Sequence, residues 1–131
     1  GSVMFSVLGL DHVVLAVADK ERAIAFYTEV LGCAVEREVE SIGLVQLRAG
    51  NSLIDIVPAD SCTLANQNMD HFCLRIEPFN VEELVEHFDR YAIKIGEAAR
   101  RYGAEGYGQS VYLQDPDGNC VELKGPPELA G

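Results

Sequence analysis

The segments LDHVVLAV at 10–17 and MDHFCLRI at 69–76 decide how this chain folds. Both are rich in β-branched and other apolar residues, as strands are, and both carry Asp-His directly after one large apolar residue. The two histidines, His12 and His71, are separated by about half of the chain. The sequence therefore predicts an internal duplication.

A helix is predicted after each of these segments. In the first half, Asp19 is the expected N-cap and Gly32 the expected helix end, and apolar residues at helical spacing lie between them. In the second half, Asn80 and Glu83 form the pattern of a capping box. His87 falls on the polar side of this second helix, where we expect it to contact solvent.

Three strand-like runs follow each helix, so the order βαβββ occurs twice. The runs are CAVERE, LVQLRA and SLIDIV in the first half and AIKIGEA, QSVYLQ and NCVELK in the second. Turn sequences at 50–51 and 116–119 predict the last hairpin of each half. The expected fold is therefore α+β, a single domain at 1–131 built of two repeats, about 8–58 and 69–124.

Each half ends in a strand with one acid among aliphatic residues, Asp55 in SLIDIV and Glu122 in NCVELK. A carboxylate on the inner face of a strand is costly to bury unless its charge is compensated. His12, Asp55, His71 and Glu122 hold equivalent places in the two halves, so a pseudo-twofold arrangement could bring them together. Such ligands suit iron, manganese, nickel, cobalt or zinc, one divalent metal per site. The alternative is that Glu122 pairs with Lys124 or with an arginine at the rim of a sheet.

The composition of the chain excludes several kinds of partner. At 131 residues it suits one compact domain, and no run approaches the roughly 18 consecutive apolar residues of a membrane span. The formal net charge of −11 repels a phosphate backbone, so nucleic acid is not an expected partner. No signal peptide precedes the first strand and no Cys-x-x-Cys spacing occurs, which favours a reducing cytoplasm. The cysteines are Cys33, Cys62, Cys73 and Cys120.

Three stretches together resemble the vicinal oxygen chelate superfamily: LDHVVLAVADKERAIAFYTEVLG, MDHFCLRI and SVYLQDPDGNCVEL. That superfamily includes glyoxalase I, fosfomycin-resistance thiol transferases, extradiol dioxygenases, methylmalonyl-CoA epimerase and bleomycin-resistance proteins, and the resemblance covers residues 8–124. It implies two βαβββ modules that form an incomplete mixed-sheet barrel around a metal, usually in a homodimer. The metal ligands that it implies are His12, His71 and Glu122. Glyoxalase I and the epimerase place a fourth ligand where Asp55 falls.

The resemblance also implies a type of reaction. A small substrate would bind the metal through two adjacent oxygens, the metal would act as a Lewis acid, and Asp55 or Glu122 would carry a proton. Tyr112 would donate a hydrogen bond in the pocket. Ala16 stands where glyoxalase has an arginine for glutathione, which argues against glutathione as cosubstrate. We therefore expect a glyoxalase-like enzyme, a metal-dependent lyase or isomerase that acts on a small molecule.

Three other members of the superfamily are alternatives. A bleomycin-resistance-type module would sequester a ligand in a dimer without metal, but the retention of both histidines and Glu122 argues against it. A fosfomycin-type thiol transferase would share Tyr112, but Val14 stands where that group has a hydroxyl residue. An extradiol dioxygenase would share Tyr112, Gly118 and Glu122, but its catalytic histidine has no counterpart in RRYGAEGYGQS at 100–110.

Overall fold

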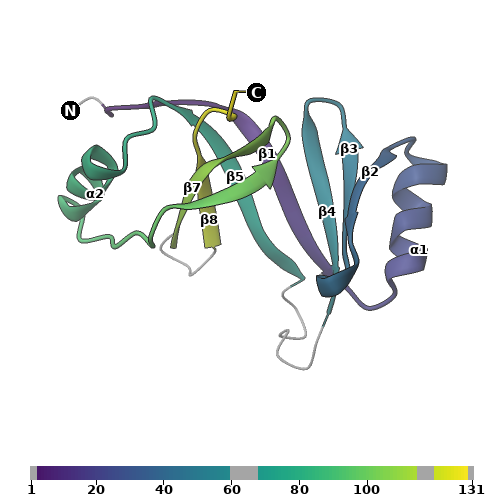
Figure 1. The fold of residues 1–131 in the computed structure, drawn as a ribbon. Helices are drawn as coiled ribbons and strands as arrows, with labels where there is room; N and C mark the ends of the chain where they lie inside the picture. Colours follow the sequence, from purple (N-terminus) through teal and green to yellow (C-terminus); the bar gives the residue numbers. More distant parts are fainter. Residues whose placement is uncertain (1–2, 60–67, 115–119, 130–131) are drawn as a thin grey trace. The chain divides into compact units, whose positions relative to one another are not determined.

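The computed structural model describes residues 3–59, 68–114 and 120–129, whose elements follow the predicted order (Figure 1). The α+β class and the two βαβββ modules are confirmed. The first module contains β1 (Ser6–Val17), α1 (Lys20–Ala25), the π-helical turn η1 (Phe26–Val30), β2 (Ala34–Val39), the 3-10 turn η2 (Glu40–Ile42), β3 (Leu44–Ala49) and β4 (Ser52–Pro58). The second contains β5 (Met69–Glu77), α2 (Val81–Asp89), β6 (Ala99–Gly103), β7 (Gly106–Gln114) and β8 (Cys120–Lys124).

The strands form a mixed sheet in the order β2-β3-β4-β1-β5-β8-β7-β6. In each module the last strand is parallel to the first, β4 to β1 and β8 to β5, and the hairpins are antiparallel. The same pairing therefore recurs in both modules, as a duplication predicts. By its contacts the chain divides into a first unit, residues 12–71, and a second unit, residues 1–11 with 72–131. Both β1 and β5 continue from one unit into the other.

The sheet of the first unit has an apolar face and a polar face. Leu47 and Ile56 are buried on the apolar face, and Ile24 of α1 packs against their cluster. Figure 1 shows α1 lying along this part of the sheet, beside β2 and β3. Because side chains alternate along a strand, burial of Leu47 and Ile56 directs their neighbours Gln46 and Asp55 to the opposite, polar face.

The second unit has a core of its own. Leu84 of α2 packs against Ile76 and Val111, which belong to β5 and β7, and all three are fully buried. Glu122 and Lys124 of β8 point away from this core by alternation, yet each is only 1% exposed. Strand β8 is therefore buried on both of its faces. One face carries aliphatic side chains, and the other carries charged ones.

Both helices begin as the sequence predicts. Oδ1 of Asp19 accepts a hydrogen bond from the backbone nitrogen of Arg22, and Oδ1 of Asn80 accepts one from that of Glu83, each at 3.0 Å. These bonds satisfy backbone donors that a helix N-terminus leaves without intrahelical partners. The first helical segment continues through η1, and the left-handed backbone at Gly32, with φ of 81°, follows its end.

The expectation that His87 contacts solvent is wrong. The residue is 9% exposed, and its ring lies edge-on to the rings of Phe5 and Phe88, with centroids 5.9 and 5.1 Å away. The N-terminal segment that carries Phe5 covers the side of α2 that the helical pattern assigns to water. A helical pattern read alone does not reveal such a covering segment.

The strand expected at 92–98 is also displaced. These residues form no strand, and β6 is built by the next residues, ARRYG, which pair with β7 from Ala99 to Gly103. Ile95 instead packs against the core of the second unit, and the backbone nitrogen of Gly96 donates to the carbonyl of Tyr112. The apolar residues of this run therefore reflect core packing and not a ladder of strand hydrogen bonds.

Some predictions fall partly or wholly outside the described residues. These are the turn at 116–119 and Cys62. The other cysteines, Cys33, Cys73 and Cys120, form no disulfide within the described ranges. Within the described ranges, no helix has the length and apolar character needed to cross a membrane.

Candidate functional site

His12 of β1 and His71 of β5 face each other within the first unit. Their Nε2 atoms are 3.2 Å apart, and the two rings are nearly perpendicular, at 84°. The residues are almost fully buried, 4% and 9% exposed. The structure therefore brings together the two histidines that the duplication singles out.

A carboxylate holds the opposite side of the His71 ring. Nδ1 of His71 lies 2.7 Å from Oδ2 of Asp70. An ionised carboxylate only accepts hydrogen bonds, so when the His71 ring is neutral this contact places the hydrogen on Nδ1 and the lone pair on Nε2, toward His12. The sequence analysis assigned no role to Asp70, although the repeated Asp-His pair was a signal that could have found it.

The histidine pair fits a divalent metal. Two imidazole nitrogens that bind one ion at about 2.1 Å, with tetrahedral or octahedral angles, are about 3.0 to 3.4 Å apart. The Nε2–Nε2 distance of 3.2 Å falls in this range, and the lone pair on Nε2 of His71 is what a ligand needs. A carboxylate added to two imidazoles gives a donor set that suits first-row transition metals.

Asp55 lies on the polar face of the first unit. Strands β1 and β4 pair Val14 with Asp55, so Asp55 is next to the strand position two residues after His12, on the same face. It is 4% exposed, and its Oδ2 accepts a hydrogen bond from Nε2 of Gln46 at 3.1 Å. Oε1 of Gln46 in turn accepts one from Arg37 at 3.2 Å, which sets the orientation of the amide. Direct contact between Asp55 and a metal stays a prediction.

Glu122 lies in the second unit, in the middle of β8. It pairs in register with Cys73 of β5 and with Tyr112 of β7. Its exposure of 1% confirms the expected burial of this carboxylate.

Tyr112 is next to Glu122 on the same sheet face. Burial raises the pKa of the Tyr112 hydroxyl, the negative charge of Glu122 raises this pKa further, and Arg101 opposes the shift. The hydroxyl therefore keeps its proton at neutral pH and can donate a hydrogen bond. Tyr112 also lines a cavity of about 610 Å³ together with Lys94 and Gln114, a volume typical of small-molecule pockets.

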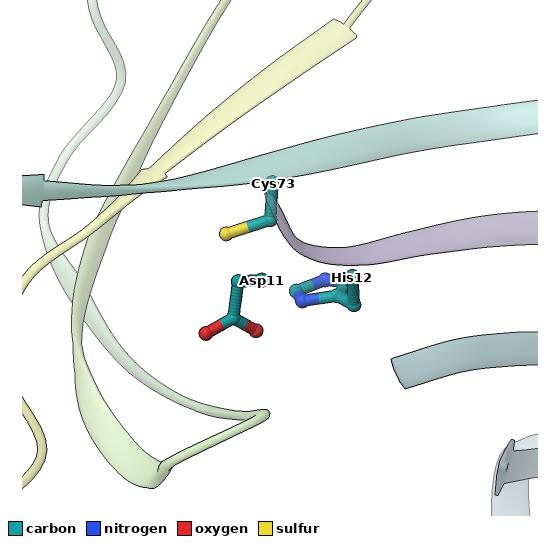
Figure 2. Close-up of side chains that lie close together, drawn as sticks. All are labelled: Asp11, His12 and Cys73. Carbon is teal, nitrogen blue, oxygen red and sulfur yellow. The ribbon is translucent and has the colours of Figure 1, made fainter. Parts of the chain in front are cut away.

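In the first Asp-His pair, the aspartate has a different kind of partner from that of Asp70 in the second pair. Asp11, 2% exposed and in the second unit, accepts a hydrogen bond at Oδ1 from the backbone nitrogen of Ala104 at 2.8 Å. Figure 2 shows its carboxylate beside the thiol of Cys73. The buried Lys124 donates from Nζ to the carbonyl of Arg101 at 2.9 Å. Burial lowers the pKa of Lys124, and the charge of Asp11 opposes this shift. The sequence analysis did not predict this buried charged cluster.

The sequence and the fold both match known proteins. The Salmonella typhimurium virulence protein STM3117 is 29% identical to this chain, over 93% of this chain and 87% of that protein. Methylmalonyl-CoA epimerase from Mycobacterium tuberculosis has the same fold, with a TM-score of 0.68 and 19% identity, over 98% of this chain and 94% of that one. The Mn(II)-bound glyoxalase from Novosphingobium aromaticivorans has a TM-score of 0.73 at 20% identity, over 93% of this chain and 39% of that one.

A family assignment follows from the sequence itself. The pattern of one superfamily matches residues 9–123, which is nearly the whole chain and includes both histidines and Glu122. The fold found in the epimerase and the glyoxalase agrees with that match. This chain belongs to the Glyoxalase/Bleomycin resistance protein/Dioxygenase superfamily.

Proposed function

We propose that the protein is a divalent-metal-dependent, glyoxalase-like enzyme of the lyase or isomerase type. Its substrate is a small molecule that chelates the metal through adjacent oxygens. The observation that carries the proposal is the buried pair of Nε2 atoms of His12 and His71, 3.2 Å apart, with Asp70 on Nδ1 of His71. Two proteins of the same fold, an epimerase and an Mn(II)-bound glyoxalase, support it by what their names state.

Glu122 is the third ligand in this proposal. Cys73 follows His71 by two residues on β5, so the two side chains are on the same face of that strand. Cys73 is also the register partner of Glu122. A buried carboxylate needs a compensating charge, which a divalent ion shared with the two histidines would provide.

The side chains around this metal site have separable tasks. A bound divalent ion would supply Lewis-acid stabilisation of negative charge that develops on the substrate. Asp55 takes up a proton at Oδ1 while Gln46 donates to Oδ2 and holds the plane of the carboxylate, and Glu122 is the alternative proton carrier. Tyr112, whose pKa is raised by burial, donates a hydrogen bond to the substrate.

Metal binding is expected to stabilise the fold. An ion that binds only the native state adds about 2.7 kcal/mol at a concentration of 100 Kd, which for this chain length raises Tm by about 10 °C. The measurement is thermal unfolding of EDTA-treated, untagged protein with manganese, nickel, cobalt, zinc or iron(II), with magnesium and sodium chloride as controls. If none of the transition metals moves the curve, the metal-free sequestering module is the better assignment.

Asp70→Ala is expected to weaken metal binding about 10- to 100-fold, because a carboxylate on the second nitrogen of a ligating histidine orients the ring. Stability should change little, since the Asp70 side chain is 59% exposed. Calorimetric titration with manganese measures the affinity, and Glu38→Ala is the control because that acid is exposed on β2. Equal affinities of Asp70→Ala and wild type would show that Asp70 does not act on the site.

We further propose that the protein works as a homodimer in the cytoplasm. Support for the dimer comes from large apolar side chains that stay exposed in the single chain, among them Leu10, Phe26 and Val30. The cytoplasmic location is proposed from the cysteine spacing of the sequence, which contains no Cys-x-x-Cys motif. Light scattering at micromolar concentration tests the dimer, and a mass of 14.3 kDa would contradict it.

A further inference from the structure

Among the described residues, the side-chain hydrogen bonds of Arg101, on β6 of the second unit, all come from its Nη1 group. Nη1 donates to the backbone carbonyl and to the hydroxyl of Ser110, each at 2.9 Å. The guanidinium lies over the ring of Tyr112, 4.4 Å from the centroid. These contacts fix the position of the cation without neutralising it, since Ser110 and Tyr112 carry no negative charge at neutral pH.

This arrangement differs from that of the other arginines whose ion pairs the structure describes. The chain has 21 acidic and 10 basic residues, so an arginine is expected to lie near a carboxylate. Within the described ranges, Arg101 has no carboxylate partner. The arginines that have one are Arg48 with Glu36, Arg75 with Glu105, Arg90 with Glu86 and Arg100 with Glu128.

Within the described chain, Arg101 does not donate from Nε or Nη2. These two groups form the bidentate edge of the guanidinium, the side that can bind both oxygens of one acidic group. Arg48 shows what this edge does in the same protein, because its Nε and Nη2 groups bind the two oxygens of Glu36 at 2.8 and 2.7 Å. In Arg101 the Ser110 contacts occupy Nη1, so Nε–H and Nη2–H remain for a planar or tetrahedral oxyanion.

Arg101 is also next to the residues assigned to the reaction. Its guanidinium covers the ring of Tyr112, and Tyr112 is the register partner of Glu122. An anion on the bidentate edge of Arg101 would thus lie beside the tyrosine that donates to the substrate.

We propose that Arg101 binds an oxyanion group, a carboxylate or a phosphoryl group, of the small molecule that this enzyme transforms. The inference rests on the proposed function for the identity of the site, and it adds the substrate class: an anionic molecule with an acidic group separate from the oxygens that chelate the metal. Because the protein carries a net charge of −11, an anion would be attracted here by the local positive charge of Arg101 and not by the field of the whole molecule.

The test uses EDTA-treated protein, so that it does not depend on metal. Inorganic phosphate and, separately, acetate are titrated at constant ionic strength while NMR follows the Nε–H signals of the arginines. We expect a saturable shift of the Arg101 signal, and a loss of affinity of about tenfold or more in Arg101→Gln, since a charge-assisted pair is removed. Arg101→Lys keeps the charge without the bidentate edge, so its affinity should also fall.

Arg100→Gln is the matched control. Arg100 is the adjacent residue of the same strand, but it points to the other face, where it binds Glu128 and lies over Tyr107. It should bind either anion within about twofold of wild type. The proposal is overturned if neither anion shifts the Arg101 signal, or if Arg100→Gln loses as much affinity as Arg101→Gln.

Failure of this inference is distinguishable from failure of the proposed function. If anions bind at Arg101 but no metal stabilises the protein, the proposed anion site is supported and the proposed metal-dependent function is rejected. A metal-dependent shift in Tm without any anion response at Arg101 would do the reverse. The amide spectrum of each variant reports whether it is folded. If Arg101→Gln does not fold, Arg101→Lys replaces it in the titrations.

Discussion

Replacing Glu122 or His71 with alanine is expected to abolish stoichiometric metal binding. Each substitution removes one of the three proposed ligands, and the remaining two cannot hold a first-row metal against water at micromolar concentration. For His71 the substitution also removes the ring that Asp70 orients. Calorimetric titration of EDTA-treated protein with manganese measures the loss, and the melting temperature without metal shows whether each variant is folded.

Asp55→Ala should give a smaller loss than these two. If Asp55 contacts the ion through water, affinity falls about 10- to 100-fold, as for groups that support metal ligands, and most of the activity is lost if Asp55 is the base. Its bond from Gln46 shows that part of its carboxylate already has a protein partner. Wild-type affinity in Asp55→Ala would leave a three-ligand site.

The exposed acid on β2 provides the control for this series. Glu38→Ala removes the same charge from the surface and should leave metal affinity unchanged. The decisive result is that of Glu122→Ala, because its metal affinity shows whether the buried acid binds the metal or has only a structural role. Unchanged affinity in Glu122→Ala would overturn the assignment of the whole site.

Asp11→Ala is expected to have the largest effect on stability, a loss of about 2 to 4 kcal/mol. The substitution leaves the backbone nitrogen of Ala104 without its acceptor, and it removes the negative charge that compensates the buried ammonium of Lys124. The space around this pair is tightly filled. A Cβ placed on Gly103 would be 2.6 Å from Cε of Lys124, so the lysine side chain packs directly against the backbone of this glycine.

Urea unfolding of metal-free protein measures this effect, and Asp70→Ala is the matched control. The two acids occupy the same place in the two Asp-His pairs, but Asp70 is mostly exposed. We therefore expect Asp11→Ala to lower stability and Asp70→Ala to lower metal affinity. Similar unfolding midpoints for both variants would show that Asp11 is not required for the buried cluster.

Much of the fold could be predicted because its signals are local. The caps at Asp19 and Asn80 depend on residues within one helical turn, and the alternation that places Glu122 on the face opposite its aliphatic neighbours is a property of one strand. The duplication identified His12 and His71 because equal segments fold alike. The position of β6 was predicted wrongly because it depends on a non-local contact. Whether 92–98 or 99–103 forms the strand is decided by which residues pair with β7.

The sequence by itself determined the two βαβββ modules, the pairing of the two histidines as equivalent positions, and the membership of the superfamily. Only the tertiary structure decided how the two identical Asp-His pairs differ. Asp70 binds the ring of its own neighbour, whereas Asp11 binds Ala104, which is 93 residues away in the chain. Contacts of that range depend on which strands become neighbours in space. The period of a single strand or helix carries no information about them, and the roles of Asp11 and Lys124 could not be derived before the fold was known.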